Sequence, residues 1–136
     1  IDAGLTPEDL VVFKYEDEGI STLEDGLYTT EESLEDPEMV DKLARFVRAS
    51  MKGWKYAEEN VEEAADIVLE NDQTGAQTEK HQTRMMGEIA KLTEGSDGRL
   101  DEAAFDRSAE ITMEGGMITK APEGAWTHDI TDKALQ

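Results

Sequence analysis

Cysteine is absent from this 136-residue chain, and histidine occurs only twice. The absence of cysteine excludes disulfide bonds, thiolate nucleophiles and sulfur-ligated metals, while it leaves the cellular compartment open. His81 and His128 lie far apart and have no ligand-type neighbour at helix or hairpin spacing, so we expect both at the surface. No serine lies in a Gly-x-Ser-x-Gly setting, and no glycine-rich phosphate loop occurs. The sequence therefore predicts no enzyme, no metal site and no cofactor.

Basic residues are also scarce, because 13 Lys and Arg accompany 33 Asp and Glu, which gives a formal net charge of −20. Such a charge repels nucleic acid and anionic membrane surfaces, and it disfavours an anionic ligand unless local groups reverse the field. We interpret it mainly as a solubility feature. No apolar run approaches the roughly 20 residues that cross a bilayer. The chain opens at Ile1 without a start Met or a signal peptide, as a processed or excised piece would.

The clearest pattern present is a long amphipathic helix that begins after Asp36. Its apolar residues recur three and four positions apart, the period of one helical face: Met39, Val40, Leu43, Ala44, Val47, Met51 and Trp54. Asp36 suits the N-cap and Pro37 the first helical position. Asn60, with Glu63 three residues later, predicts a capping box at the start of a second helix. Because of its spacing, we expect Trp54 in the core.

The other elements are predicted from local composition. Leu10–Tyr15 and Leu27–Thr30 are strand candidates, because branched and aromatic residues are common in them. Two short strands need partners, and the rest of the chain offers almost none. Further helices are predicted over Thr78–Thr93, from the Asp101 N-cap to about Glu114, and over Ile130–Leu135.

The order of these elements divides the chain into three regions. Residues 1–30 form a strand and crossover segment, residues 31–114 a helical region, and residues 115–136 an extended tail with a short terminal helix. The 136 residues together fit one single piece of common domain size.

A resemblance to a known family enters at the run RFVRASMKGWKYAEENVEEAADIVLEN. It resembles a motif of the periplasmic solute-binding proteins of ABC importers, in the branch for nitrate, sulfonates, taurine and thiamine precursors. In that family a helix of this form follows the strand that returns from the second lobe to the first. The matching residues are Phe46, Val47, Arg48, Ala49, Lys52, Gly53, Trp54, Tyr56, Ala57, Glu59, Asn60, Glu63 and Ala64. Those proteins are much longer, so the resemblance covers only their C-terminal part.

The resemblance implies an α/β family fold of the periplasmic binding protein-like II class, of which this piece is mainly α-helical with one or two short strands. It implies the substrate-binding component of an ABC importer, which captures a small molecule between two lobes and delivers it to the permease in the periplasm or another extracytoplasmic space. The segment beside the ligand cleft would supply the binding residues Tyr15, Glu16, Glu18, Gly19 and Tyr28. Carboxylates there would favour a neutral or basic heterocycle over nitrate or a sulfonate.

Three alternatives stay open. The acidic segment around Glu16 can be a solvated loop without a ligand. The chain can be a stand-alone acidic helical module that binds a protein partner. It can also be related to the eukaryotic pyrimidine synthases of thiamine synthesis, which share the binding-protein fold, although their cysteine-rich motif is missing. As a piece of a two-lobed protein, the chain would expose apolar faces and is expected to self-associate.

Overall fold

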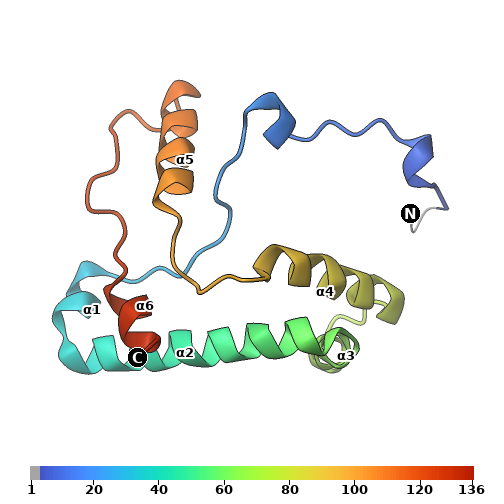
Figure 1. Ribbon diagram of the computed structural model, residues 1–136, viewed down its shortest axis with the longest axis horizontal. Coiled ribbons are helices and arrows are strands. Elements are labelled where there is room, and N and C mark those ends of the chain that lie inside the picture. Colours follow the sequence, from blue (N-terminus) through green and yellow to red (C-terminus); the bar gives the residue numbers. More distant parts are fainter. Residues whose placement is uncertain (1–3) are drawn as a thin grey trace. The chain divides into compact units, whose positions relative to one another are not determined.

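The computed structural model describes residues 4–136, and over this part the chain is helical, with short 3-10 helices near its start (Figure 1). The elements are η1 (Pro7–Asp9), η2 (Glu16–Glu18), α1 (Glu31–Glu35), α2 (Pro37–Glu59), α3 (Val61–Asn71), α4 (Glu79–Thr93), α5 (Glu102–Glu114) and α6 (Asp129–Ala134). The chain divides into two compact units. The first unit contains the residues up to Asp36 and Arg99–Asp129, and the second contains Pro37–Gly98 and Ile130–Gln136.

The predicted helical character is confirmed, but the two predicted strands are wrong. Residues 10–15 and 27–30 contain no strand, and their large side chains are exposed, with Val11 at 83% and Phe13 at 81%. A strand forms its backbone hydrogen bonds with a neighbouring strand, and residues 4–136 contain no strand that could serve. The segment LVVFKY has the composition of a strand, but it finds no partner strand within the described chain.

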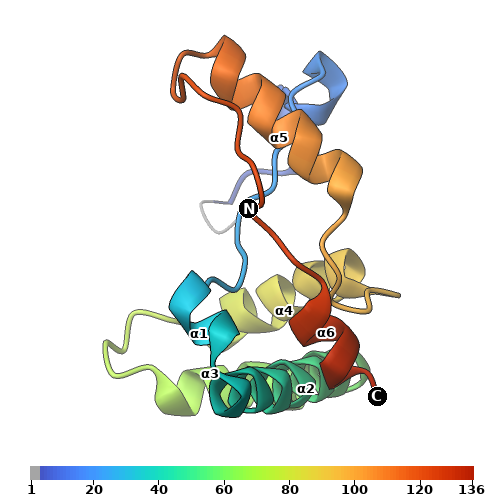
Figure 2. The same cartoon turned by 90° about the vertical axis from the view of Figure 1, so that its left-hand side faces the viewer.

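The second unit is a small helical assembly around α2. α3 and α4 pack against each other and both contact α2. Near the other end of α2, Ala134 of α6 is buried against Ala44 and Val47, with Met51 and Ile130 packed around them. Figure 2 shows α6 beside α2. The apolar stripe of α2 is thus covered in two places by different helices.

The core of this unit is shallow. Its buried apolar residues are almost all alanines, namely Ala44, Ala64, Ala65 and Ala134, with Val47 as the largest member. Small side chains let helix backbones approach closely, but they bury little apolar area. The expectation that Trp54 lies in the core is wrong, since 44% of its surface is exposed.

Most helix starts lie where the sequence predicts them. The Oδ1 of Asp101 accepts a hydrogen bond from the Ala104 N–H at 3.0 Å, and the Oγ1 of Thr78 accepts one from the His81 N–H at 3.3 Å. Asn60 does precede α3, but the predicted capping box does not form. Its Nδ2 instead donates to the carbonyl oxygen of Tyr56 at 2.9 Å, so the side chain serves the end of α2.

The first unit is held together around α5 and the segments beside it. The Leu23 N–H donates to the Oγ of Ser108 on α5 at 2.7 Å. His128 is half-buried, its Nε2 lies 3.1 Å from the carbonyl oxygen of Leu100, and its ring lies 4.8 Å from that of Trp126. Among the described residues, no helix is both long enough and apolar enough to cross a membrane.

Candidate functional site

Four of the five predicted ligand-binding residues form one tight turn. Tyr15 precedes η2, Glu16 and Glu18 lie in it, and Gly19 ends it with a φ of 79°, a conformation that glycine adopts without strain. The Gly19 N–H donates to the Glu16 carbonyl at 3.1 Å, and the Ile20 N–H donates to the Tyr15 carbonyl at 2.8 Å. These bonds occupy the carbonyls of Tyr15 and Glu16, and the exposed side chains of the turn are what a ligand would meet.

Tyr28, the fifth predicted residue, lies in the irregular segment before α1 and is 87% exposed, while Tyr15 is 75% exposed. The two hollows described next include neither tyrosine. The structure thus places Tyr15 with the acidic turn and leaves both aromatic rings open to solvent. Their role in ligand binding stays a prediction.

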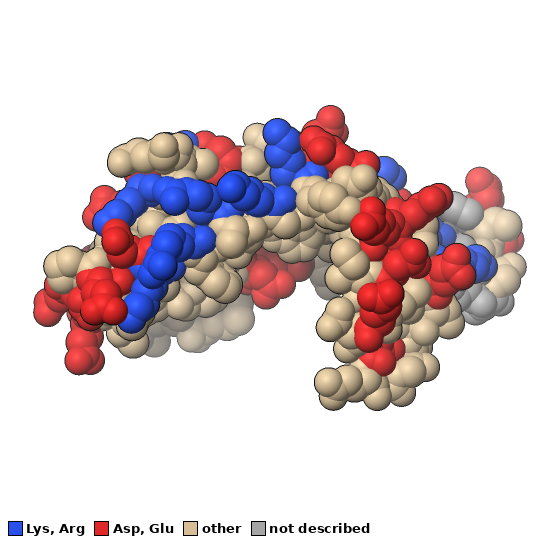
Figure 3. All heavy atoms as spheres, turned by 90° about the horizontal axis from the view of Figure 1, so that it is seen from below, with Lys and Arg blue, Asp and Glu red and all other residues tan. Residues whose placement is uncertain are grey.

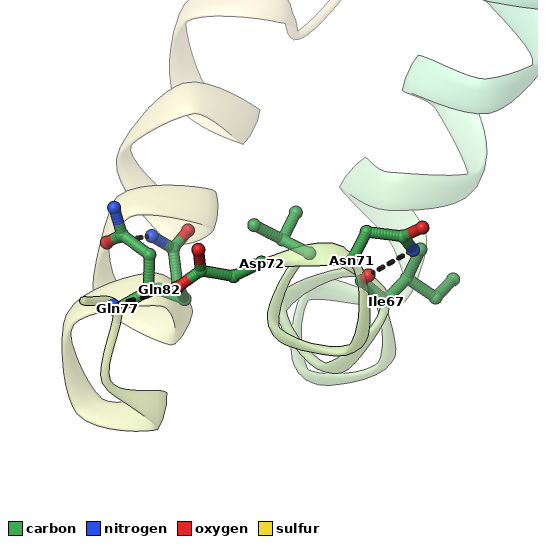
Figure 4. A pocket seen from close by; sticks show the side chains of 6 residues that line it. Ile67, Asn71, Asp72, Gln77 and Gln82 are labelled. Atoms are coloured by element: carbon green, nitrogen blue, oxygen red, sulfur yellow. Dashed lines mark hydrogen bonds between the residues drawn. The ribbon is translucent and has the colours of Figure 1, made fainter. Parts of the chain in front are cut away.

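One hollow lies between the end of α3 and the start of α4 (Figure 4). It measures about 450 Å³ and is lined by Ile67, Val68, Asn71, Asp72, Gln77 and Gln82. Its polar side chains bind one another or nearby backbone: the Nε2 of the buried Gln82 donates to the Oε1 of Gln77 at 2.6 Å, and the Nδ2 of Asn71 donates to the Ile67 carbonyl at 2.8 Å. These groups stabilise the connection between α3 and α4.

Asp72 organises that connection. Its Oδ1 accepts hydrogen bonds from the Thr74 hydroxyl at 2.6 Å and the Thr74 N–H at 2.8 Å, and its Oδ2 accepts one from the Gln77 N–H at 3.0 Å. The Thr74 hydroxyl, followed by these backbone N–H groups, lowers the pKa of Asp72 because each of them stabilises the carboxylate. Asp72 therefore holds the loop and has little remaining capacity to bind a ligand.

A larger groove, of about 790 Å³, lies in the same unit along α2. Its walls are formed by α2 residues from Arg48 to Glu58, by the loop of residues 93–98 and by residues 134–136. Three basic residues line it, namely Arg48, Lys52 and Lys55. We call it the α2 groove. The groove was not predicted from the sequence, although a signal was present: residues 42–55 contain five basic residues and no acidic one.

The two histidines lie in different parts of the chain, one on α4 and one just before α6. His81 is exposed on the first turn of α4, as predicted, and half-buried His128 contacts the Leu100 carbonyl. Within residues 4–136 no group of three or more His, Asp and Glu side chains is arranged to hold a metal ion. Residues 96–101 form the turn that leads into α5, and Asp101 caps this helix.

The comparisons with known proteins give one family. Residues 2–64 match the model of the family described as NMT1/THI5 like, and this span contains the predicted ligand-binding segment, α1, α2 and the start of α3. No curated protein and no solved structure was found to match the chain. The match confirms the resemblance that the α2 motif indicated. Residues 2–64, somewhat less than half of the chain, are thus similar to the NMT1/THI5-like family.

Proposed function

We propose that this chain is the C-terminal part of the substrate-binding component of an ABC importer, which captures a small molecule between two lobes and delivers it to the permease. The observation that carries the proposal is the family match over residues 2–64. Such a component works outside the cytoplasm, so we assign the protein to the periplasm or an equivalent extracytoplasmic space. The protein binds its ligand without chemical change.

The exposed start of the chain supports this proposal. Val11, Val12 and Phe13 expose 83%, 67% and 81% of their surfaces. Three consecutive large apolar side chains are rarely this exposed unless another surface covers them. These β-branched and aromatic residues suit a strand that a larger α/β sheet would accept as a partner. A two-lobed solute-binding protein contains such a sheet.

We place the ligand beside Tyr15, Glu16, Glu18, Gly19 and Tyr28. The two tyrosines are free to stack on a ring or to donate a hydrogen bond, and the carboxylates of Glu16 and Glu18 are exposed at the tight turn. Negative charge at this turn favours a neutral or basic heterocycle, such as an amine-bearing pyrimidine, over nitrate or a sulfonate. The related pyrimidine-synthase function has less support, because the cysteine-rich motif of those enzymes is missing from the sequence.

Thermal unfolding of the product of the complete reading frame tests this function. Pyrimidines, amines, aromatic acids, sulfonates and nitrate are added separately, and a ligand present at 100-fold its Kd adds about 2.7 kcal/mol to the free energy of unfolding. We expect a pyrimidine or an amine to raise Tm, and the double substitution Glu16→Gln with Glu18→Gln to abolish that rise. The matched control, Glu31→Gln with Glu32→Gln, changes two exposed glutamates of α1 and should keep it.

Failure has a clear form in this assay. If no compound class raises Tm, the solute-binding function is contradicted. If the ligand still raises Tm after the Glu16 and Glu18 substitutions, the assignment of the site is wrong. The 136-residue chain alone offers a second test, because its exposed apolar residues predict self-association, measured by light scattering. A strictly monomeric species that unfolds cooperatively would favour the stand-alone helical module instead.

A further inference from the structure

The part of α2 along which the groove lies carries a local positive charge in a strongly acidic chain. Five of the 13 basic residues fall within residues 42–55, where no Asp or Glu occurs. Figure 3 shows Lys and Arg side chains gathered along α2, whereas Asp and Glu side chains cover α3. Two acidic residues, Glu58 and Asp97, line the groove beside the basic residues. The net charge of −20 is thus reversed locally along this helix.

Two lysines of the groove are available to a ligand. Lys42 pairs with Glu38 at 2.9 Å, Lys133 pairs with Asp41, and Arg48 is occupied by backbone carbonyls of α6. Among the described residues, Lys52 and Lys55 form no ion pair and no side-chain hydrogen bond. They lie three positions apart on α2, so their ammonium groups extend from neighbouring positions of one helical face. Together they offer two unneutralised cations to one site.

The floor of the groove is apolar. Met51, Trp54 and Leu135 line it, and the exposed fractions of Trp54 and Leu135 are 44% and 46%. An open indole face stacks readily on a planar group. The wall opposite is close: Gly98 has a φ of 78°, and a Cβ added there would lie 2.6 Å from the Sδ of Met51. The volume of about 790 Å³ lies within the range of about 300–1,000 Å³ usual for small-molecule pockets.

We propose that the α2 groove binds a small organic anion with a planar apolar body, of the aromatic carboxylate or sulfonate class. The anionic group contacts Lys52 and Lys55, and the planar body lies on Trp54. An inorganic anion would leave the apolar floor uncovered, and an aromatic cation would meet the lysines with the wrong charge. This site is separate from the predicted binding segment at Tyr15 to Tyr28, and the inference does not depend on the transport function.

Tryptophan fluorescence tests the proposal on the 136-residue chain. The chain has two tryptophans, so the substitution Trp126→Phe leaves Trp54 as the only reporter. Phenylacetate and benzenesulfonate, added separately, are expected to change its emission in a saturable way, and the tighter of the two identifies the preferred anionic group. Acetate lacks the planar body and phenethylamine carries the opposite charge, so both should bind about tenfold more weakly or not at all.

Charge substitutions in the Trp126→Phe variant distinguish the effect of the two lysines from the effect of net charge. The double substitution Lys52→Gln with Lys55→Gln should weaken binding of the aromatic anion about tenfold, since two partly screened ion pairs are lost. The matched control, Lys14→Gln with Lys120→Gln, changes the net charge equally in the other unit and should alter the Kd less than about twofold. Lys52→Arg with Lys55→Arg should retain binding, and circular dichroism verifies that each variant is folded.

Three results would overturn the inference. The first is equal weakening by the control pair, which would assign the effect to net charge. The second is binding of phenethylamine as tight as that of phenylacetate. The third is the absence of saturable binding for both aromatic anions at concentrations up to about 10 mM. A Kd above that value is too weak for a functional site.

Discussion

The Nε of Arg48 donates a hydrogen bond of 2.7 Å to the carbonyl oxygen of Ala134, and its Nη2 donates one of 3.0 Å to the carbonyl of Lys133. Both acceptors lie at the C-terminal end of α6, where carbonyl groups lack intrahelical donors. A cation at this end also complements the helix dipole. Through this one side chain, the 23-residue α2 holds a terminal helix of six residues that is too short to be stable by itself.

Arg48→Ala should therefore release α6 from α2. Loss of two charge-assisted hydrogen bonds is expected to reduce the local stability of α6 by about 1–3 kcal/mol. Hydrogen exchange of the amides from Ile130 to Leu135 measures this directly. Arg45→Ala is the matched control, because the Arg45 Nε donates to the Asp41 carbonyl within α2, at 3.4 Å, and not to α6. Equal exchange rates in the two variants would contradict the conclusion that Arg48 holds α6 on α2.

A second contact between these helices makes their association dependent on pH. The hydrogen bond and charge of Lys133 lower the pKa of Asp41, because both favour the carboxylate. A carboxyl group with a lowered folded pKa stabilises the fold above its unfolded pKa of about 4, and this contribution disappears as pH falls through the folded pKa.

Comparison of the wild type with Asp41→Asn tests this linkage. The difference in Tm should be constant from about pH 5 to 8 and should vanish as the pH falls below about 3. The pair is exposed, so the difference is small. In a Lys133→Gln background the same Asp41→Asn substitution should show little pH dependence. A Tm difference that persists at the lowest pH would point to another cause.

Helix positions were predictable here because their signals are local. Pro37 suits the start of α2, and the side chains of Thr78 and Asp101 cap backbone groups three residues away. Asn60 shows the limit of such signals. Its side-chain amide can cap the start of α3 or donate to the end of α2, and it donates to the carbonyl of Tyr56. The local pattern predicted the boundary correctly and the hydrogen bond incorrectly.

Features that depend on distant segments were not predictable from local patterns. LVVFKY has the composition of a strand, but a strand exists only with a partner, and the described chain supplies none. Tyr15, predicted at the end of a strand, instead begins a tight turn that Gly19 closes with its positive φ. The α2 groove requires residues 93–98 and 134–136 beside α2, a long-range arrangement. Only its charge was visible in the sequence.

The loop wall of that groove depends on glycine at position 98. Gly98→Ala forces an L residue into a positive φ of 78° and directs a methyl group at Met51. Gly95→Ala, in the same loop, has a φ of 76° and open space around the new methyl group. We expect Gly95→Ala to cost about 1 kcal/mol for the backbone alone, and Gly98→Ala to cost about 1 kcal/mol more. Urea unfolding measures both, and equal costs would show that Met51 moves aside freely.

The alanine-rich core makes the second unit sensitive to added volume. Ala65 of α3 is fully buried, with 0% of its surface exposed, in a helix that packs against both α4 and α2. Ala65→Leu adds three carbon atoms at a position with no exposed surface, so α3 must shift or leucine must adopt a strained rotamer. Such overpacking typically costs about 1–3 kcal/mol.

Ala103→Leu supplies the matched comparison, because Ala103 is exposed on α5 and both residue types favour a helix. Its free energy of unfolding should change by less than about 0.5 kcal/mol. If Ala65→Leu instead left stability unchanged or raised it, the contact between α3 and its neighbours would have room for larger side chains. The close approach of helices through alanine would then no longer explain why the core is shallow.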